Sequence, residues 1–267
     1  MAPDDTYTHG HHDSVLRSHR WRTVENSAAY LIDALVPGAA VLDVGCGPGT
    51  ITADIAARVA PGRVVALDRS AEVVEEAAAA CATAGVTVEC RTGDAYALDF
   101  PDDTFDVVHA HQVLQHLTDP VAALREWIRV TRPGGVVGAR DSDYAAFHWY
   151  PVDPRLDRWL ELYRAAAYAN DAEPDAGRRL VAWAHAAGAT DVRATASVWL
   201  FANPDDRAYW GGMWADRIVE SALTTQLTSS GMATTTELEE IADAFRAWAR
   251  HPDGWFLVPH GEIRINV

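Results

Sequence analysis

Residues 41–50 read VLDVGCGPGT and place three glycines within five residues, directly after an apolar run. Glycine lets the backbone adopt positive φ angles and, because it has no Cβ, lets a ligand approach the main chain closely. A turn of this kind, between the carboxyl end of a strand and the start of a helix, is where open α/β sheets bind nucleotides. The stretch therefore predicts a nucleotide-type ligand at Gly45, Gly47 and Gly49.

The sequence around this loop alternates short apolar runs with helical stretches from residue 38 to about 141, the pattern of a parallel sheet covered by helices. Strands are predicted at residues 40–44, 63–68, 87–92, 105–111 and 135–141, and helices at residues 50–60, 71–84 and 119–131. Beyond residue 141 the pattern predicts helices at residues 154–169, 174–187, 205–222 and 235–250, and strands at residues 191–201 and 254–265. No linker or repeat divides the chain, so we expect a single domain.

The chain has a formal net charge of −16, from 38 acidic and 22 basic residues, and every basic residue is arginine. This acidic balance argues against a nucleic-acid partner, because nucleic-acid binders present a basic face that displaces counterions. Without lysine, neither a catalytic Schiff base nor a GK[ST] phosphate loop can form. A small molecule is the expected partner.

The three cysteines, Cys46, Cys81 and Cys90, form no CxxC pair, so the sequence predicts neither a disulfide framework nor a zinc site. The first residues, MAPDDTYTHGHH, lack the basic and apolar regions of a signal peptide, and no run of 18 uncharged apolar residues occurs. We therefore expect a cytoplasmic protein with no membrane partner. The number of subunits stays open, and a homodimer is compatible with the sequence.

Two nucleotide ligands compete for the glycine loop. The dinucleotide fingerprint GxGxxG needs a third glycine where Thr50 stands, and Asp43, two residues before the loop, would repel a pyrophosphate. Asp43 instead suits S-adenosylmethionine, which carries an ammonium group and a cationic sulfonium. Asp68, 25 residues after Asp43, ends the second predicted strand and can accept hydrogen bonds from both hydroxyls of a ribose, which either ligand has.

A third motif, Gly93-Asp94-Ala95, follows the third predicted strand and is placed to meet an adenine, with the carboxylate accepting from the exocyclic amine. With the motifs LDVGCGPGT, ALDRS, GDA, FDVVHAHQVLQHL and RPGG, the chain resembles the class I S-adenosylmethionine-dependent methyltransferases over residues 38 to about 141. Within them it resembles the small-molecule branch that includes the ubiquinone and menaquinone C-methyltransferases. This resemblance implies a Rossmann-like, doubly wound α/β sheet of seven strands, mostly parallel with an antiparallel last strand, and an inserted helical cap.

The resemblance also implies roles for individual residues. S-adenosylmethionine, which leaves as S-adenosylhomocysteine, would be held by Asp43, Gly45, Cys46, Gly47, Gly49, Asp68, Arg69, Gly93, Asp94, Ala95 and His111. The stretch YTHGHHDSVLRSHRWRTVENSAAYL resembles the amino-terminal helix that closes over the cofactor in related enzymes, which adds Tyr7 and His12 to the expected contacts. We interpret His9, His11 and His12 as part of this lead and not as metal ligands, and we predict no metal site.

The single domain would then have three parts: a lid at residues 1–30, a cofactor-binding half at residues 31–141, and the remaining strands with a substrate cap at residues 142–267. Of the 24 aromatic residues, 17 follow residue 142, including eight of the ten tryptophans. A tryptophan usually anchors a helix to a core, but this crowding also predicts an apolar pocket lined by the cap.

Three histidines near the fourth predicted strand are candidates for proton transfer. His109 and His111 share one face of that strand, and His111 lies at its carboxyl end, where ligands bind. We expect His109 to be a hydrogen-bonded core residue, and His116 or His111 to be the catalytic base if the acceptor must lose a proton.

These observations predict methyl transfer from S-adenosylmethionine to a small, largely apolar or aromatic acceptor, mainly by proximity and orientation. Three alternatives stay open: a cyclase or scaffold that binds S-adenosylmethionine without transferring its methyl group, an NAD-dependent oxidoreductase, and a macromolecular methyl acceptor.

Overall fold

The computed structural model describes residues 21–267. Its sheet begins with five parallel strands, β1 (Val41–Val44), β2 (Val64–Asp68), β3 (Glu89–Thr92), β4 (Phe105–His111) and β5 (Thr131–Ser142), in the order β3-β2-β1-β4-β5. The chain leaves β1 toward β2 and β3 and then returns to the other side of β1 with β4. This reversal is the switch point at which open α/β sheets bind ligands.

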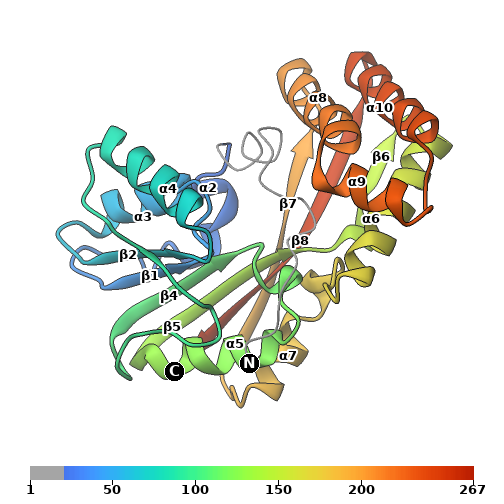
Figure 1. Ribbon diagram of the computed structural model, residues 1–267. Coiled ribbons are helices and arrows are strands. Elements are labelled where there is room, and N and C mark those ends of the chain that lie inside the picture. The colour runs from blue at the N-terminus through green and yellow to red at the C-terminus, as the bar shows by residue number, and fades with distance from the viewer. Residues whose placement is uncertain (1–20) are drawn as a thin grey trace.

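Helices cover both faces of these strands (Figure 1). On one face lie α2 (Val24–Ser27), η1 (Ala29–Leu31), α3 (Thr50–Val59) and α4 (Ala71–Thr83); on the other lie α5 (Pro120–Val130) and α7 (Leu180–Ala186). Alternate strand residues explain the arrangement, because Val41 packs with the α3 side and Leu42 packs with the α5 side. The central strands β1, β2 and β4 are buried on both faces, and the predicted doubly wound sheet is confirmed.

Three further strands complete the sheet: β6 (His148–Tyr150), β7 (Val192–Phe201) and β8 (Trp255–Asn266). β8 is antiparallel to β5, β6 and β7, and it lies between β5 and β7. The predicted antiparallel last strand is therefore confirmed. The sheet has eight strands because β6, only three residues long, pairs with β8 beyond the end of β5. Such a short strand leaves no alternation in the sequence by which to predict it.

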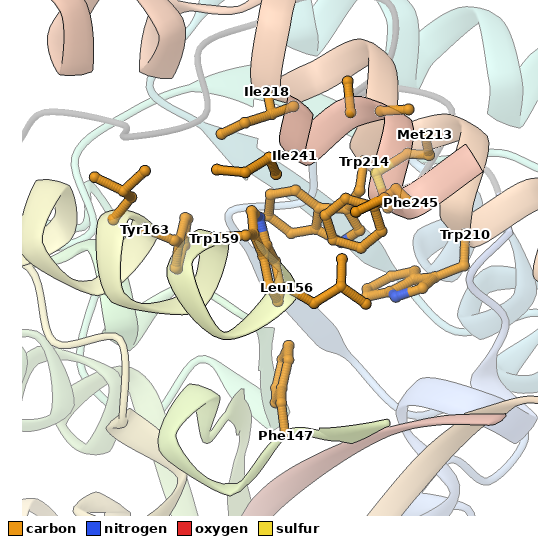
Figure 2. Packing of buried hydrophobic residues seen from close by; sticks show 14 of the residues in the cluster. Phe147, Leu156, Trp159, Tyr163, Trp210, Met213, Trp214, Ile218, Ile241 and Phe245 are labelled. Carbon is orange, nitrogen blue, oxygen red and sulfur yellow. The ribbon is translucent and has the colours of Figure 1, made fainter. Parts of the chain in front are cut away.

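Four helices form a second lobe above the sheet, which we call the cap: α6 (Pro154–Ala169), α8 (Pro204–Glu220), α9 (Ala222–Ser229) and α10 (Thr235–Arg250) (Figure 1). Figure 2 shows its core, in which Trp159 of α6 contacts Trp214 of α8 and Phe245 of α10 with ring centroids 4.5 and 5.1 Å apart. Most aromatic residues of the second half therefore fill a core, as tryptophans usually do.

The cap differs from the predicted helices at two places. The helix expected at residues 205–222 ends at Glu220, because Ser221 has an extended backbone and caps the new helix α9 together with Thr224. The helix expected at residues 174–187 is divided into η4 (Ala176–Arg178) and α7. None of the helices in residues 21–267 has both the length and the apolar character needed to span a bilayer.

Candidate active site

A cavity of about 440 Å³ lies where the carboxyl ends of β1, β2 and β4 face the cap. Its volume is in the range of small-molecule sites. The loops after β1, β2 and β3 line one end, which we call the cofactor end. Residues of η3 (Tyr144–Ala146), β7, β8 and α8 line the other, the acceptor end. The predicted site residues that line the cavity are Asp43, Gly45, Cys46, Gly47, Asp68, Arg69, Gly93, Asp94, Ala95, His111 and His116.

Gly45 and Gly49 perform different tasks in the glycine loop. Both have left-handed φ angles, of 66° and 81°. A Cβ at Gly45 would lie 2.5 Å from the Val113 side chain, so glycine here keeps the cavity wall open. A Cβ at Gly49 would lie 2.8 Å from Cα of Ala77 in α4, so glycine here lets α3 start against α4. Gly49 does not line the cavity. Its left-handed φ serves helix packing, and its predicted ligand contact stays a prediction.

Asp43 is buried at the end of β1, and both of its carboxylate oxygens have partners. Oδ1 lies 2.7 Å from Nδ1 of His109, and Oδ2 accepts a 2.5 Å hydrogen bond from the Thr52 hydroxyl. His109 is thus the hydrogen-bonded core residue that the sequence predicted. Asp43 ties β4 and α3 to β1 while it contributes a carboxylate to the cofactor end.

Asp68 and Asp94 follow the next two strands and hold their own loops. Asp68 accepts hydrogen bonds from the backbone N–H of Gly47 at 3.2 Å and of Ser70 at 3.1 Å. Asp94 accepts from the N–H of Tyr96 at 2.9 Å. A Cβ at Gly93, between these acids, would lie 2.7 Å from the Leu67 side chain. Both carboxylates line the cofactor end of the cavity, where their oxygens can accept hydrogen bonds.

Cys46 lines the same end, and burial, reinforced by Asp43 and Asp68, raises the pKa of its thiol far above the usual value. The side chain therefore stays neutral. It contributes shape, and its N–H is bonded to the Leu67 carbonyl at 3.0 Å. Arg69 and Ala95 line the cavity as well. Tyr7 and His12 lie outside the described residues.

His111 ends β4 and is buried, and neither ring nitrogen has a hydrogen-bond partner in residues 21–267. Burial, followed by the nearby Arg22 and Arg140 guanidinium groups, lowers its pKa well below the usual value. The imidazole is therefore neutral at pH 7. Its two nitrogens are available to a bound molecule.

His116 lies in η2 (Leu114–His116), where its Nε2 is 3.0 Å from the side-chain nitrogen Nε2 of Gln115. Burial, with a smaller effect of Arg22, lowers its pKa to about 3. A histidine with this pKa is neutral but a weak base, because proton-accepting strength falls with pKa. The role of His116 or His111 as the catalytic base stays a prediction.

Sequence reasoning overlooked Gln112, which directly follows β4. Its φ is 56°, in the left-handed region that a glutamine rarely adopts, and such strain is commonly held at functional sites. Its side chain contacts Arg22, the Ser142 hydroxyl at 2.6 Å and Nε2 of His260 at 3.0 Å. The available signal was its position one residue beyond the end of a strand at the switch point.

The acceptor end is largely aromatic, as the crowding of aromatic residues in the second half predicted. Trp210, Trp214 and Arg217 are three and four residues apart on α8 and so share one face of that helix. The rest of this end is formed by Arg22, Ser142, Tyr144, Phe147, Trp199 and Val258. No three His, Cys, Asp or Glu side chains within residues 21–267 are grouped so as to hold a metal ion.

Comparison with known proteins identifies the chain's relatives. Residues 41–135 match the family described as "Methyltransferase domain". The chain is 33% identical over 266 residues to an uncharacterized methyltransferase of Schizosaccharomyces pombe, C1B3.06c, across 96% of this chain and 95% of that protein. It is 36% identical over 143 residues to 2-methyl-6-phytyl-1,4-hydroquinone methyltransferase of Synechocystis sp., across 52% of this chain and 44% of that protein.

Solved structures share the fold. YcgJ from Bacillus subtilis is similar with a TM-score of 0.57 and 25% identity, over 89% of this chain and 97% of that one. The [4+2]-cyclase SpnF is similar with a TM-score of 0.51 and 20% identity, over 93% of this chain and 80% of that one. The family match decides against the NAD-dependent oxidoreductase that the glycine loop alone left open. The chain belongs to the class I S-adenosylmethionine-dependent methyltransferases, and S-adenosylmethionine is its cofactor.

Proposed function

We propose that this enzyme transfers the methyl group of S-adenosylmethionine to a small, largely apolar or aromatic acceptor. The observation that carries the proposal is the single cavity that joins a carboxylate-lined end to an aromatic end. A cationic cofactor suits the first, and a planar apolar molecule suits the second. The named substrate of the Synechocystis relative, a hydroquinone, is an acceptor of this kind and supports the small-molecule quinone-like branch.

The roles of individual residues at the cofactor end are part of this proposal. Asp68 binds the ribose hydroxyls, and Asp94 with Gly93 and Ala95 receives the adenine. The carboxylate of Asp43, already bonded to His109 and Thr52, acts on the methionine ammonium through its charge. The other proposed contacts are Gly45, Cys46, Gly47, Arg69 and His111. The chain is proposed to form a single domain in which the segment before α2, with Tyr7 and His12, forms the lid. Residues 24–30, which the sequence predicted as part of the lid, pack against the sheet instead.

When bound, S-adenosylmethionine supplies an electrophilic methyl group: the acceptor's electron pair forms the new bond to carbon while the C–S pair returns to sulfur, giving S-adenosylhomocysteine. The protein's main task is to hold the two reactants in line, and proximity of this kind can supply about 7–11 kcal/mol. A proton on the acceptor atom passes to His116 or His111, or to water. Because both imidazoles are weak bases, we place orientation before base catalysis.

The experiment is to incubate the full chain with S-adenosylmethionine and a panel of hydroquinones, phenols and aromatic acids, and to measure S-adenosylhomocysteine and methylated product by mass spectrometry. We expect S-adenosylhomocysteine and the methylated product in equal amounts, and neither of them in a control without acceptor. If the whole panel gave no product, the proposed acceptor class would be wrong.

A second candidate function is supported by the likeness to the [4+2]-cyclase SpnF. In that case the cofactor remains intact and the cavity promotes a rearrangement of its substrate. The same measurement separates the two functions, because a cyclase would convert substrate without forming S-adenosylhomocysteine. In either case we propose a cytoplasmic protein that acts on small molecules. We also propose that it forms a homodimer, which size-exclusion chromatography with light scattering tests.

A further inference from the structure

We infer that the acceptor is an aromatic acid: a planar ring that bears a carboxylate, or a group of similar acidity, ionised at neutral pH. Arg217 is its principal recognition residue, with Arg22 beside it. The inference rests on the proposed function, because it names the substrate class of that same cavity.

The two ends of the cavity differ in the balance of the charges that line them. Asp43, Asp68 and Asp94 lie at the cofactor end, where Arg69 is the accompanying cation. At the acceptor end, the charged side chains that line the cavity within residues 21–267 are Arg22 and Arg217. The histidines between the two ends are neutral. A cationic cofactor and an anionic acceptor would each meet the opposite charge.

Arg217 is buried and lies against an aromatic ring, as expected of a side chain that recognises a ligand. It is 4% exposed, and its guanidinium lies over the Trp214 ring with 4.7 Å from Cζ to the ring centroid. Two other buried arginines lie away from the cavity: Arg140 pairs with Glu262, and Arg207 donates to the Ala202 and Ala249 carbonyls. Neither lines the cavity, whereas Arg217 does. A guanidinium binds a carboxylate through two parallel hydrogen bonds, which fixes the orientation of the acid.

Trp210, on the same face of α8, adds a second donor. Its Nε1–H is buried and has no hydrogen-bond acceptor in residues 21–267. An indole N–H can only donate, and leaving it unbonded in a buried position is unfavourable. An acceptor oxygen on the bound molecule would satisfy it. A neutral hydrocarbon would leave this N–H without an acceptor.

The aromatic partners for a ring stand beside these donors. Tyr144 is stacked on Phe147 with centroids 4.4 Å apart, and both line the cavity. Burial is the main influence on Tyr144 and raises its pKa, whereas Arg217 and Arg22 lower it. The positive potential of both guanidinium groups therefore reaches the aromatic wall. The same potential would favour ionisation of an acceptor hydroxyl and reduce the need for a strong base.

The test is calorimetry on the full chain saturated with S-adenosylhomocysteine, using acids paired with their neutral amides. The pairs are 4-hydroxybenzoate and 4-hydroxybenzamide, 6-hydroxy-2-naphthoate and its amide, and indole-3-acetate and its amide. In at least one pair, the carboxylate should bind about tenfold or more tightly than the amide, as expected for a charge-assisted hydrogen-bonded pair. Arg217→Gln should abolish the preference, and Arg217→Lys should retain part of it.

Arg246→Gln is the matched control, because it removes the same charge from an exposed position on α10 and should leave the preference unchanged. If Arg217→Gln does not fold, the wild-type pairs and Arg217→Lys still decide. Equal binding within every pair, or no binding of any probe, would overturn the inference. Binding of S-adenosylhomocysteine is measured first, so its absence would mark a failure of the proposed function, and its presence without a charge preference a failure of this inference alone.

Discussion

The cofactor end and the cap build the same cavity by different means. At the cofactor end the backbone sets the shape: Gly45, Gly49 and Gln112 have left-handed φ angles, and the loop N–H groups bind the Asp68 side chain and the Leu67 carbonyl. In the cap, side chains on regular helices set the shape, and one face of α8 lines the cavity while neighbouring residues fill the core. The cofactor end therefore tolerates little change of backbone conformation, and the cap tolerates little change of side-chain volume.

Truncation of the cap core should have the largest effect on stability. Trp159 is fully buried among Trp214, Phe245 and Phe256, and it does not line the cavity. Trp159→Ala should lower the free energy of unfolding by about 3–5 kcal/mol. Affinity for S-adenosylhomocysteine in the folded protein should change less than about twofold. Denaturant unfolding and calorimetry measure the two quantities, with exposed Glu161→Ala on the same helix as the control.

A loss of binding free energy for S-adenosylhomocysteine as large as the loss of unfolding free energy would show that the cap core also shapes the cofactor end. The two ends would then not be built independently.

The second prediction concerns a glycine in each region. Gly49→Ala should cost about 2–4 kcal/mol, since an alanine would be strained at a φ of 81° and its Cβ would press on the α4 backbone. Gly212→Ala in α8 should instead stabilise by about 0.5–1 kcal/mol, because its Cβ would meet open space within a helix. Thermal unfolding of both variants checks the opposite signs; a similar shift for the two would contradict the assigned role of Gly49.

The third prediction concerns Asp141, where the two regions join at the end of β5. Burial raises its pKa to about 7, and its Oδ1 accepts from the Gln115 N–H at 3.1 Å. A carboxyl whose pKa is higher in the folded than in the unfolded state favours folding at low pH and loses that contribution as pH rises through about 7. Asp141→Asn should therefore gain about 2 kcal/mol relative to the wild type between pH 5 and pH 8.

Urea unfolding at the two pH values measures this difference. Comparison with the variant cancels the opposite dependence of His111, His116 and His260, whose lowered pKa values favour folding above neutral pH and oppose it as pH falls. A constant difference between the two proteins would mean that Asp141 is ionised throughout.

The sequence predicted the cofactor end better than the acceptor end, for a physical reason. The loop after β1 has a spacing of glycines and an acid that few backbones other than this turn require, so Asp43, Gly45 and Asp68 could be placed before the structure was known. Gly49 shows the limit, because the same φ requirement can serve helix packing as well as ligand approach.

In the cap, the crowding of aromatic residues indicated a pocket. It could not show which of these residues line the pocket and which fill the core. Trp214 and Trp159 look alike in the sequence, yet only the first lines the cavity. That difference depends on how α6 and α8 lie relative to the cavity, a tertiary property. The short strand β6 was missed because it exists through pairing with β8, which lies far along the chain. The break at Ser221 was missed because capping hydrogen bonds, and not periodicity, create it.

Calorimetry with S-adenosylhomocysteine tests whether the loop after β1 and the acid after β2 hold an adenosyl amino acid. The wild type should bind it, and Asp68→Ala should bind about tenfold or more weakly, in keeping with about 1.5–3 kcal/mol for a charge-assisted hydrogen bond. Asp99→Ala, an exposed acid removed nearby, should bind as the wild type does. No heat with the wild type would mean that the cavity does not bind this ligand. Unchanged affinity in Asp68→Ala would mean that Asp68 does not hold its ribose.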